Sequence, residues 1–457
     1  MTHYLRLAIV PAYLLLCLLL GGASAAGHWA NMVLQLLAIP IIFRAFLVRR
    51  ATPMPAPARQ LIFGLILLLL LVIVQLVPLP PSLWTSLPGR QPFAQGLELL
   101  NLPLPWLPIS LAPYATISSA LWLLPAVAVL LGIIRVGAFR TSWMAWVIAV
   151  VATASVLIGA LQVVGGELSP WYFYSITNYG STVGFFANSN HMATLLVCAI
   201  PFLAALYLGA VGRGKPTRRT SGMFVILAGA VAVTLAGVAI NGSLAGVGLA
   251  IPVAFASFLM IWSRKRKLPR WAWPGVGLLV AGAVVLAYNV PFSNNNLTGE
   301  GRNAADSRAY SFSVTSEAAK DFMPVGSGLG TFVRVFHLYE DPATVDRFYM
   351  NHAHGDYLEL ALETGLPGLL LVLLFLLWWG WRAAAVWRAE EPDYYARAAT
   401  IASAAILAHS AVDYPLRTAA IAAVFALCCA LMAEPRARER SRKKAAPDNS
   451  PRHLSAD

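Results

Sequence analysis

The acidic residues that begin a long apolar stretch near residue 356 are the strongest candidates in this sequence for chemistry. Asp356, Glu359 and Glu363 are spaced by three and four residues, so they share one face if the segment is helical. Ionisable groups within a membrane helix are costly and usually functional. Snorkelling toward the membrane interface is the alternative, but Glu363 lies nearly two turns inside. We therefore interpret the three carboxylates as a functional cluster.

Two histidines precede this acidic face. His352 and His354 are the only closely paired histidines in the chain. A neutral histidine takes a proton from a hydroxyl near pH 7, and a nearby carboxylate orients it. Two histidines at i, i+2 also suit zinc, but no third ligand with metal-site spacing is apparent, so we predict no metal. The catalytic candidates are therefore His352, His354, Asp356 and Glu363.

Arginines are the side chains best suited to hold a phosphate-like anion, because their fork matches its oxygens. The segment 291–356 contains Arg302, Arg308 and Arg334, but its acidic residues outnumber its basic ones. One or two placed arginines would have to bind any anion, and a surface salt bridge is the alternative for each. The glycine-rich stretch 326–332 lacks the strand-to-helix context of a phosphate cradle, so a tight structural turn is the simpler interpretation.

A second polar group lies toward the end of the chain. His409 and Asp413 are i, i+4 neighbours, and Arg417 follows them. They form either a structural hydrogen-bonded pair or a support for a substrate site. Asn190 ends the segment 165–190, which is rich in aromatic and amide residues. Its aromatic side chains would stack on sugars or anchor the chain at the membrane interface.

The elements that position these residues must lie in lipid. The 457 residues are 58% hydrophobic and 12% charged, whereas a soluble domain is about 25% charged. This composition excludes an ordinary soluble enzyme and a disordered chain. The four cysteines all lie in apolar runs, so no disulfide framework is indicated. Runs of about 20 apolar residues predict an all-α polytopic integral membrane protein with about twelve transmembrane helices, at 7–26, 29–48, 60–78, 114–134, 143–164, 191–211, 221–240, 244–262, 271–290, 357–381, 398–412 and 416–433.

The positive charge indicates the orientation of these helices. With the N-terminus in the cytoplasm, most of the 33 lysines and arginines fall in cytoplasmic segments. The net charge of +13 therefore reports topology, and no nucleic-acid partner is expected. Ala23-Ser24-Ala25 imitates a signal-peptide cleavage site, but the immediate continuation into a second span favours an uncleaved first helix. The predicted parts are helices 1–9 over 1–290, a large outer loop over 291–356, helices 10–12 over 357–433, and a basic cytoplasmic tail over 434–457.

The stretch from His354 to Gly368 resembles a motif near the last outer loop of O-antigen ligases. That motif has a histidine, a short polar residue, nine further residues, and two glycines three apart. His354, Gly365 and Gly368 take the histidine and glycine positions, and Gly355 stands where the family has its amide. Other pieces resemble the wider O-antigen ligase and polymerase superfamily over about residues 75–430, namely Pro78, Pro80 and Pro81, the stretch 186–191, Ser307-Arg308 before 326–332, and the stretch 409–417.

The resemblance implies a metal-independent glycosyltransferase of the bacterial inner membrane with no cofactor. Such an enzyme takes a glycan from undecaprenyl diphosphate on the periplasmic side, which makes the outer loop periplasmic. The acceptor is a lipid A-core sugar in ligases, another lipid-linked repeat in polymerases, and a protein hydroxyl in pilin-type oligosaccharyltransferases. Carried over, His354 is the base and Arg308 the best diphosphate ligand. Many relatives have a Ser-Arg pair where this chain has Ser243-Leu244, so either Arg302, Arg334 or Arg417 replaces the missing arginine or this chain binds its donor differently.

Three functions remain open. The first is an inverting, ligase-type transferase, in which arginines stabilise the diphosphate leaving group and membrane lipids surround the donor. The second is a repeat-unit polymerase of the same superfamily. The third is a lipid-linked oligosaccharide flippase or a permease, which would line its interior with charge over many spans. Here the charge gathers at one outer corner, which favours an enzyme whose partners are the lipid-linked donor and a lipid A-core or glycan acceptor.

Overall fold

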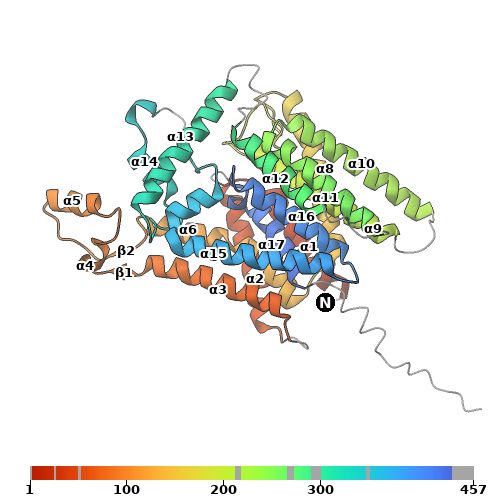
Figure 1. The fold of residues 1–457 in the computed structure, drawn as a ribbon, viewed down its shortest axis with the longest axis horizontal. Helices are drawn as coiled ribbons and strands as arrows, with labels where there is room; N and C mark the ends of the chain where they lie inside the picture. The colour runs from red at the N-terminus through yellow and green to blue at the C-terminus, as the bar shows by residue number, and fades with distance from the viewer. Residues whose placement is uncertain are drawn as a thin grey trace, which may run out of the picture.

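The computed structural model describes residues 3–24, 27–49, 53–211, 218–264, 272–289, 300–345 and 350–434. Most of these residues are helical (Figure 1). The strands β1 (Pro78–Leu79) and β2 (Leu107–Pro108) form one short antiparallel pair. The helices are α1 (His3–Leu20), α2 (His28–Leu47), α3 (Ala56–Leu76), α4 (Pro81–Trp84), α5 (Gln91–Leu99), α6 (Pro113–Trp122), α7 (Leu124–Leu131), α8 (Thr141–Val164), α9 (Ser189–Val211), α10 (Arg218–Asn241), α11 (Leu244–Trp262), α12 (Ala272–Asn289), α13 (Glu300–Asp321), α14 (Phe332–Tyr339), α15 (Asp356–Arg388), α16 (Tyr394–His409) and α17 (Ala419–Ala433).

The predicted all-α polytopic membrane class is confirmed. A helix lies at each of the twelve predicted stretches, with α6 and α7 together forming the fourth. Within the described ranges, eight helices are long and apolar enough to cross a membrane, and α1 and α17 are shorter but also apolar. Large apolar side chains such as Phe43, Phe63 and Ile73 are exposed on α2 and α3. Such surfaces suit contact with hydrocarbon, because lipid is as apolar as these side chains.

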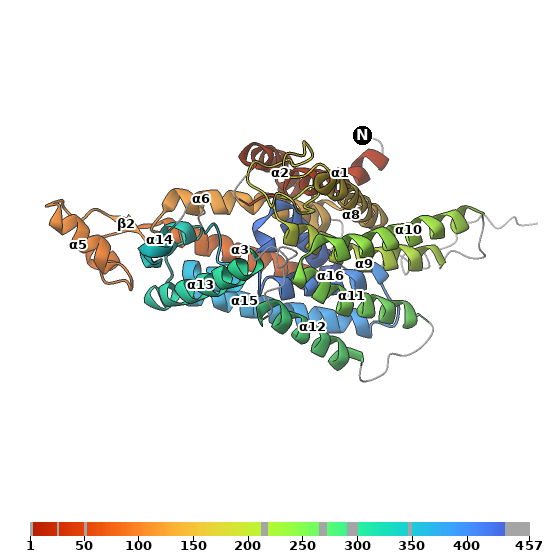
Figure 2. The ribbon, with the colours of Figure 1, turned by 90° about the horizontal axis from the view of Figure 1, so that it is seen from above.

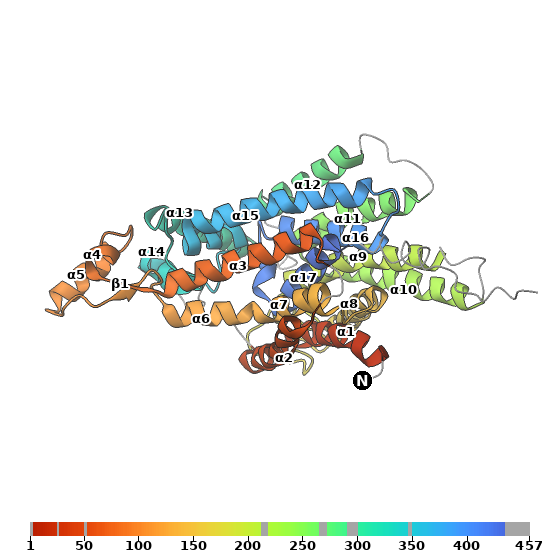
Figure 3. The same ribbon diagram turned by 90° about the horizontal axis from the view of Figure 1, so that it is seen from below.

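Helix α9 lies at the centre of the bundle. In the most apolar 18-residue stretch of α9, 83% of the residues are buried inside the protein. In the corresponding stretch of α3 only 11% are buried. It packs on α8, α10, α11 and α16, while α17 packs on α1, α7 and α16. Figures 2 and 3 show α9 and α16 among the other helices, and Figure 3 shows α17 there as well. Helices α3 and α15 pack on each other and lie side by side in Figures 1 and 3. The centre of the bundle is therefore built from α9, in the middle of the chain, and from the last two helices, α16 and α17.

Residues 300–345 form a small helical layer beside the bundle rather than an irregular loop. Helices α13 and α14 enclose an apolar cluster that includes Phe322, Phe332 and Phe336. Arg90, between α4 and α5, lies with its guanidinium 5.1 Å from the centre of the Phe322 ring and donates to the carbonyl oxygen of Gly326 at 3.1 Å. Burial lowers the pKa of Arg90 to about 10. The connection between α4 and α5 is thus packed against residues 300–345, and the predicted division into domains stays a prediction.

Helix α15 is broken at its tenth residue, and this break sets the position of the acidic face. Gly365 has φ 58° and ψ −149°, a backbone conformation that residues other than glycine rarely adopt. A Cβ atom there would lie 2.2 Å from the carbonyl oxygen of Pro324. The amide of Leu366 donates to that same oxygen at 2.8 Å. Pro367 then begins the long second part of α15, where a proline costs no hydrogen bond.

Candidate active site

The three carboxylates at the start of α15 all face one arginine. Nε of Arg417 lies 3.6 Å from Oδ1 of Asp356, and Nη1 lies 3.2 Å from Oε1 of Glu359. Nη1 and Nη2 each donate to Oε2 of Glu363 at 3.1 Å. The prediction that Asp356, Glu359 and Glu363 share one helical face is therefore confirmed. The arginine comes from the 3₁₀ turn Pro415–Arg417 between α16 and α17.

This cluster is nearly closed to solvent. The side chains of Glu359 and Glu363 are 1% and 0% exposed, and that of Arg417 is 19% exposed. Burial works to lower the pKa of Arg417, but the three neighbouring carboxylates outweigh burial and raise it. The guanidinium therefore stays charged. Because three carboxyl groups surround it, the cluster has an acidic excess that can stabilise a further positive charge.

His352 extends the cluster toward the surface. Its Nδ1 atom lies 3.0 Å from Oε1 of Glu359, and its side chain is 15% exposed. The backbone amide of Ala353 donates to the other oxygen of Glu359 at 2.9 Å. If Nδ1 carries the proton and donates to Glu359, the opposite nitrogen, Nε2, is left as a base. Glu359, the middle residue of the acidic face, is therefore the partner of His352, one of the two predicted catalytic histidines.

His354, the motif histidine, has an unusual backbone. Its φ is 55°, in the left-handed region that residues other than glycine seldom adopt. The side chain is half-buried. Such strained positions gather at functional sites, where the surrounding structure holds them. The next residue, Gly355, is extended, but a Cβ there would lie 2.9 Å from the ring of Phe312 on α13. A side chain at this position, where the resemblance places an amide, would therefore displace the ring of Phe312.

Tyr414 joins three histidines that are far apart in the sequence. Its ring centre lies 4.3 Å from that of His352, 5.2 Å from that of His354 and 4.9 Å from that of His191. Asn188 donates to the tyrosine hydroxyl at 3.4 Å. Burial raises the pKa of Tyr414, so the hydroxyl remains neutral and can both donate and accept a hydrogen bond. Sequence reasoning assigned no role to Tyr414 or His191; the position of the tyrosine between two predicted site residues was the available signal.

Asp413 connects this aromatic group to α9. Its carboxylate accepts hydrogen bonds from the amide of Asn190 and, at 2.8 Å, from the backbone N–H of Tyr414. Nε2 of His191 lies 3.8 Å from the same carboxylate. Nδ1 of His409 lies 2.8 Å from Oγ1 of Thr194, and the backbone N–H of Asp413 donates to the carbonyl of His409. The structure thus brings Asn190 and Asp413 to the site, with His409 one layer behind.

The glycine-rich turn supports Glu363. The backbone N–H groups of Gly330 and Phe332 donate to Oε1 of Glu363 at 2.9 and 3.3 Å. Gln75 of α3 donates to the carbonyl of Glu363 at 2.9 Å and accepts from the amide of Leu329 at 3.0 Å. The interpretation as a tight structural turn is confirmed, because the turn's amides hold a carboxylate of the protein itself. Gly368, the second motif glycine, lies against Thr364 in the preceding turn of α15, because a Cβ at residue 368 would meet the Thr364 side chain.

Of the three arginines predicted in the segment 291–356, Arg334 is the one whose side chain the structure describes, and it makes no contact with this cluster. Arg302 and Arg308 belong to the α13 backbone, but their side chains lie outside the described residues. Arg334 is exposed on α14. Leu244, where relatives have an arginine, begins α11, and Ser243 caps that helix by accepting the amide of Gly246 at 3.1 Å. Within the described ranges, no group of three or more histidine, cysteine or acidic side chains is arranged to hold a metal ion.

The fold and the site together define a multi-pass membrane protein with a nearly buried polar cluster at one end of its bundle. Residues 229–373 match the family model described as O-antigen ligase. This match supports placing the chain in the O-antigen ligase and polymerase superfamily. The matched range contains both candidate histidines, the acidic face and both motif glycines, whereas Arg417, Tyr414 and Asn190 lie outside it. No curated protein matches the chain.

Proposed function

We propose that this protein is an inner-membrane glycosyltransferase that moves a glycan from undecaprenyl diphosphate to an acceptor hydroxyl on the periplasmic side. The family match supports ligase- or polymerase-type activity in general. The observation that carries the finer proposal is the pairing of His352 with the buried carboxylate of Glu359 at 3.0 Å, next to the motif residue His354. A carboxylate-oriented histidine beside a second histidine suits activation of a hydroxyl.

In this proposal His354 accepts the proton of the acceptor hydroxyl. As the proton moves, a positive charge develops on the imidazole. The acidic excess around Arg417 stabilises that charge, and Tyr414 keeps the rings of His352 and His354 in position. Arg417 is then a positioning residue, because its fork already contacts the carboxylates. The activated oxygen attacks the sugar carbon opposite the leaving diphosphate, so the anomeric configuration inverts.

The donor diphosphate would bind away from the acidic face, because like charges repel at short range. Helix α13 packs against α15 and bears Arg302 and Arg308, and α14 bears the exposed Arg334. We propose Arg308 as the first diphosphate ligand, with the other two in support. Arg308→Lys is expected to lose most of the transfer activity, because a point charge does not replace a bidentate fork. Full activity in that variant would remove Arg308 from the donor site.

The test of the function is the profile of surface glycans, separated by size, in a strain that lacks this gene. For a ligase we expect free lipid A-core and long chains that accumulate on undecaprenyl diphosphate. Single repeat units, on the carrier or on the core, would instead assign the polymerase reaction to the same site. An unchanged profile would contradict the proposal and favour a permease.

A further inference from the structure

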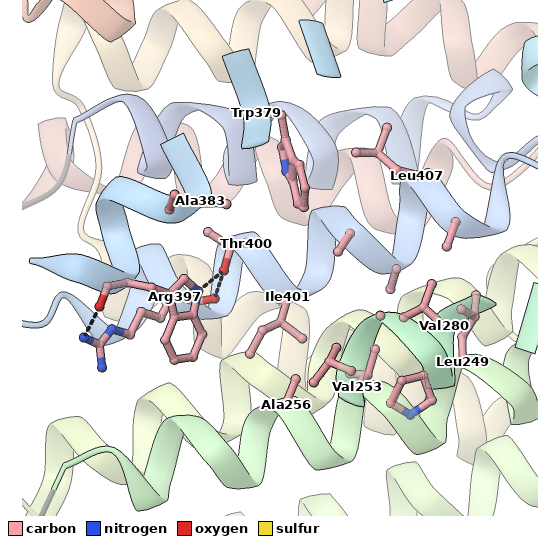
Figure 4. Close-up of a pocket in the computed structure, with 18 of the residues that line it drawn as sticks. Leu249, Val253, Ala256, Val280, Trp379, Ala383, Arg397, Thr400, Ile401 and Leu407 are labelled. Atoms are coloured by element: carbon pink, nitrogen blue, oxygen red, sulfur yellow. Dashed lines mark hydrogen bonds between the residues drawn. The ribbon is translucent and has the colours of Figure 1, made fainter. Parts of the chain in front are cut away.

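A large cavity lies between α11, α12, α15 and α16, and none of the residues of the candidate site lines it. Its volume is about 1080 Å³, slightly above the usual range for small-molecule sites. Figure 4 shows Leu249, Val253, Ile401 and Leu407 around it, with Trp379 on the α15 side. The lining is mostly aliphatic and aromatic, so the body of the cavity suits a hydrocarbon chain.

One end of the cavity is basic. Arg397 lines it and is only 6% exposed. Its guanidinium donates to Oγ of Ser263 at 3.0 Å and to the carbonyl of Trp387 at 3.3 Å. Its centre lies 4.8 Å from the centre of the Trp387 ring. Arg264 and Arg388 line the same end, so three cationic side chains meet the apolar body there.

Arg397 has an unmet hydrogen-bond donor. Among the described residues, nothing accepts a hydrogen bond from its Nε atom. A buried donor without a partner is costly, and more so when it is charged. No acidic side chain is among the described residues that line the cavity. Asp393 lies close to Arg397, but its carboxylate caps α16 by accepting the amides of Tyr395 and Ala396. The basic end is thus suited to an anion that the protein does not itself supply.

This end is remote from the candidate active site. Arg397 lies in the first turn of α16, and His409 is its last residue. A helix rises 1.5 Å per residue, so the two ends of this 16-residue helix are about 24 Å apart. Arg388 likewise ends α15, which begins at Asp356. In the predicted topology the basic end faces the cytoplasmic leaflet.

We propose that the cavity binds one anionic glycerophospholipid, with its phosphate at Arg397 and an acyl chain between α11 and α16. The buried guanidinium supplies an unmet N–H for a phosphate oxygen, and a phosphate is the group whose geometry that fork matches. Free phosphate would leave the apolar body of the cavity unfilled. A polyprenyl chain would fill it but would leave the arginines without an anion, since the donor diphosphate belongs at the other end in the proposed function. The lipid site does not depend on the transferase reaction.

Native mass spectrometry of the full-length protein, purified in mild detergent, tests the proposal. The probes are palmitoyl-oleoyl phosphatidylglycerol and the zwitterionic phosphatidylcholine with the same chains. We expect one phosphatidylglycerol bound in preference to phosphatidylcholine. Arg397→Gln should weaken the binding of phosphatidylglycerol about tenfold or more, the usual effect of losing a charged hydrogen bond. Arg59→Gln, a change at an exposed arginine of α3 that does not line the cavity, should leave the binding unchanged.

A second variant tests whether the cavity binds an acyl chain, and it leaves the arginines unchanged. Ala404→Phe places a ring in the cavity and should reduce the binding of phosphatidylglycerol even if Arg397→Gln fails to fold. Equal binding of the two lipids, or full binding after Ala404→Phe, would overturn the proposal. Binding of inorganic phosphate without binding of either lipid would show a phosphate site without a lipid and would also overturn the proposal. Displacement by undecaprenyl phosphate in both the native protein and Arg397→Gln would assign the cavity to the polyprenyl chain instead.

Discussion

Two arginines at opposite ends of the bundle have opposite surroundings. Arg417 contacts three buried carboxylates. Arg397 donates to two neutral oxygens, and its Nε has no acceptor in the described part of the chain. A guanidinium surrounded by carboxylates holds its neighbours in place, whereas one with an unmet donor beside a cavity is available to a ligand. The partners, rather than the residue type, indicate which arginine positions a site and which one binds an anion.

The largest effect on stability is expected at Arg417. Arg417→Gln leaves Asp356, Glu359 and Glu363 without their cation, and breaking a buried ion cluster costs about 3–5 kcal/mol. Thermal unfolding in detergent measures the change in the free energy of unfolding. Arg397→Gln is the matched comparison and should lose less, because it breaks no ion pair with a carboxylate within the described ranges. Equal losses of stability in the two variants would contradict the proposed difference between the surroundings of Arg417 and Arg397.

Glu359 tests the catalytic side of the same comparison. Glu359→Gln keeps the size of the side chain but removes a charge that orients His352 and that belongs to the acidic excess stabilising the imidazolium of His354. We expect the rate of glycan transfer to fall about tenfold to a hundredfold, the range found when the carboxylate that orients a metal-bound histidine is removed. Glu340→Gln, which changes the partner of the exposed His337 on α14, is the control. A normal rate in Glu359→Gln would show that the pairing is only structural.

The break in α15 is the next feature to test. Gly365→Ala introduces a Cβ against the carbonyl of Pro324 at a φ of 58°, which should destabilise the protein by about 1–3 kcal/mol. Gly380→Ala is the control, because it lies in the same helix with nothing within 4 Å of the added Cβ. That change should be neutral or slightly stabilising. Similar unfolding temperatures for the two variants would remove the break as a requirement for the site.

The smallest effect is expected at Tyr414. Tyr414→Phe keeps the ring between the histidines but removes the hydroxyl that accepts from Asn188. A loss of about 1 kcal/mol in stability is typical of one neutral hydrogen bond, and transfer should fall less than about tenfold. Tyr414→Ala should be far worse, because it removes the packing of the rings. If Phe and Ala have the same effect on transfer, the hydroxyl rather than the ring is essential.

Local spacing predicted much of the fold and part of the site. Apolar runs located the helices, because length and hydropathy are properties of a continuous segment. The acidic face followed from the helical period of Asp356, Glu359 and Glu363. Their partners did not follow, since Gln75 contacts Glu363 across 288 residues and Asn190 contacts Asp413 across 223. Contacts of such separation depend on helix packing, which no local pattern encodes.

The role of Arg417 illustrates the same limit. The sequence presents Arg417 as one of several arginines able to hold a diphosphate, because its positive charge suits that role. The 3₁₀ turn Pro415–Arg417 directs it onto α15 instead, where its fork contacts the protein's own carboxylates. An arginine that holds a substrate can therefore be told from one that holds the protein's own carboxylates only once α15 is packed against the connection between α16 and α17.

The most direct test of the proposed function is glycan transfer by purified protein in vesicles that contain the undecaprenyl-diphosphate-linked donor and an acceptor. His354→Ala is compared with His337→Ala, a matched change at an exposed histidine of α14. Loss of a general base lowers the rate about 10²–10⁴-fold. We predict that loss for His354→Ala, with normal folding and donor binding, and a normal rate for His337→Ala. Full transfer by a folded His354→Ala protein would contradict the assignment of the base.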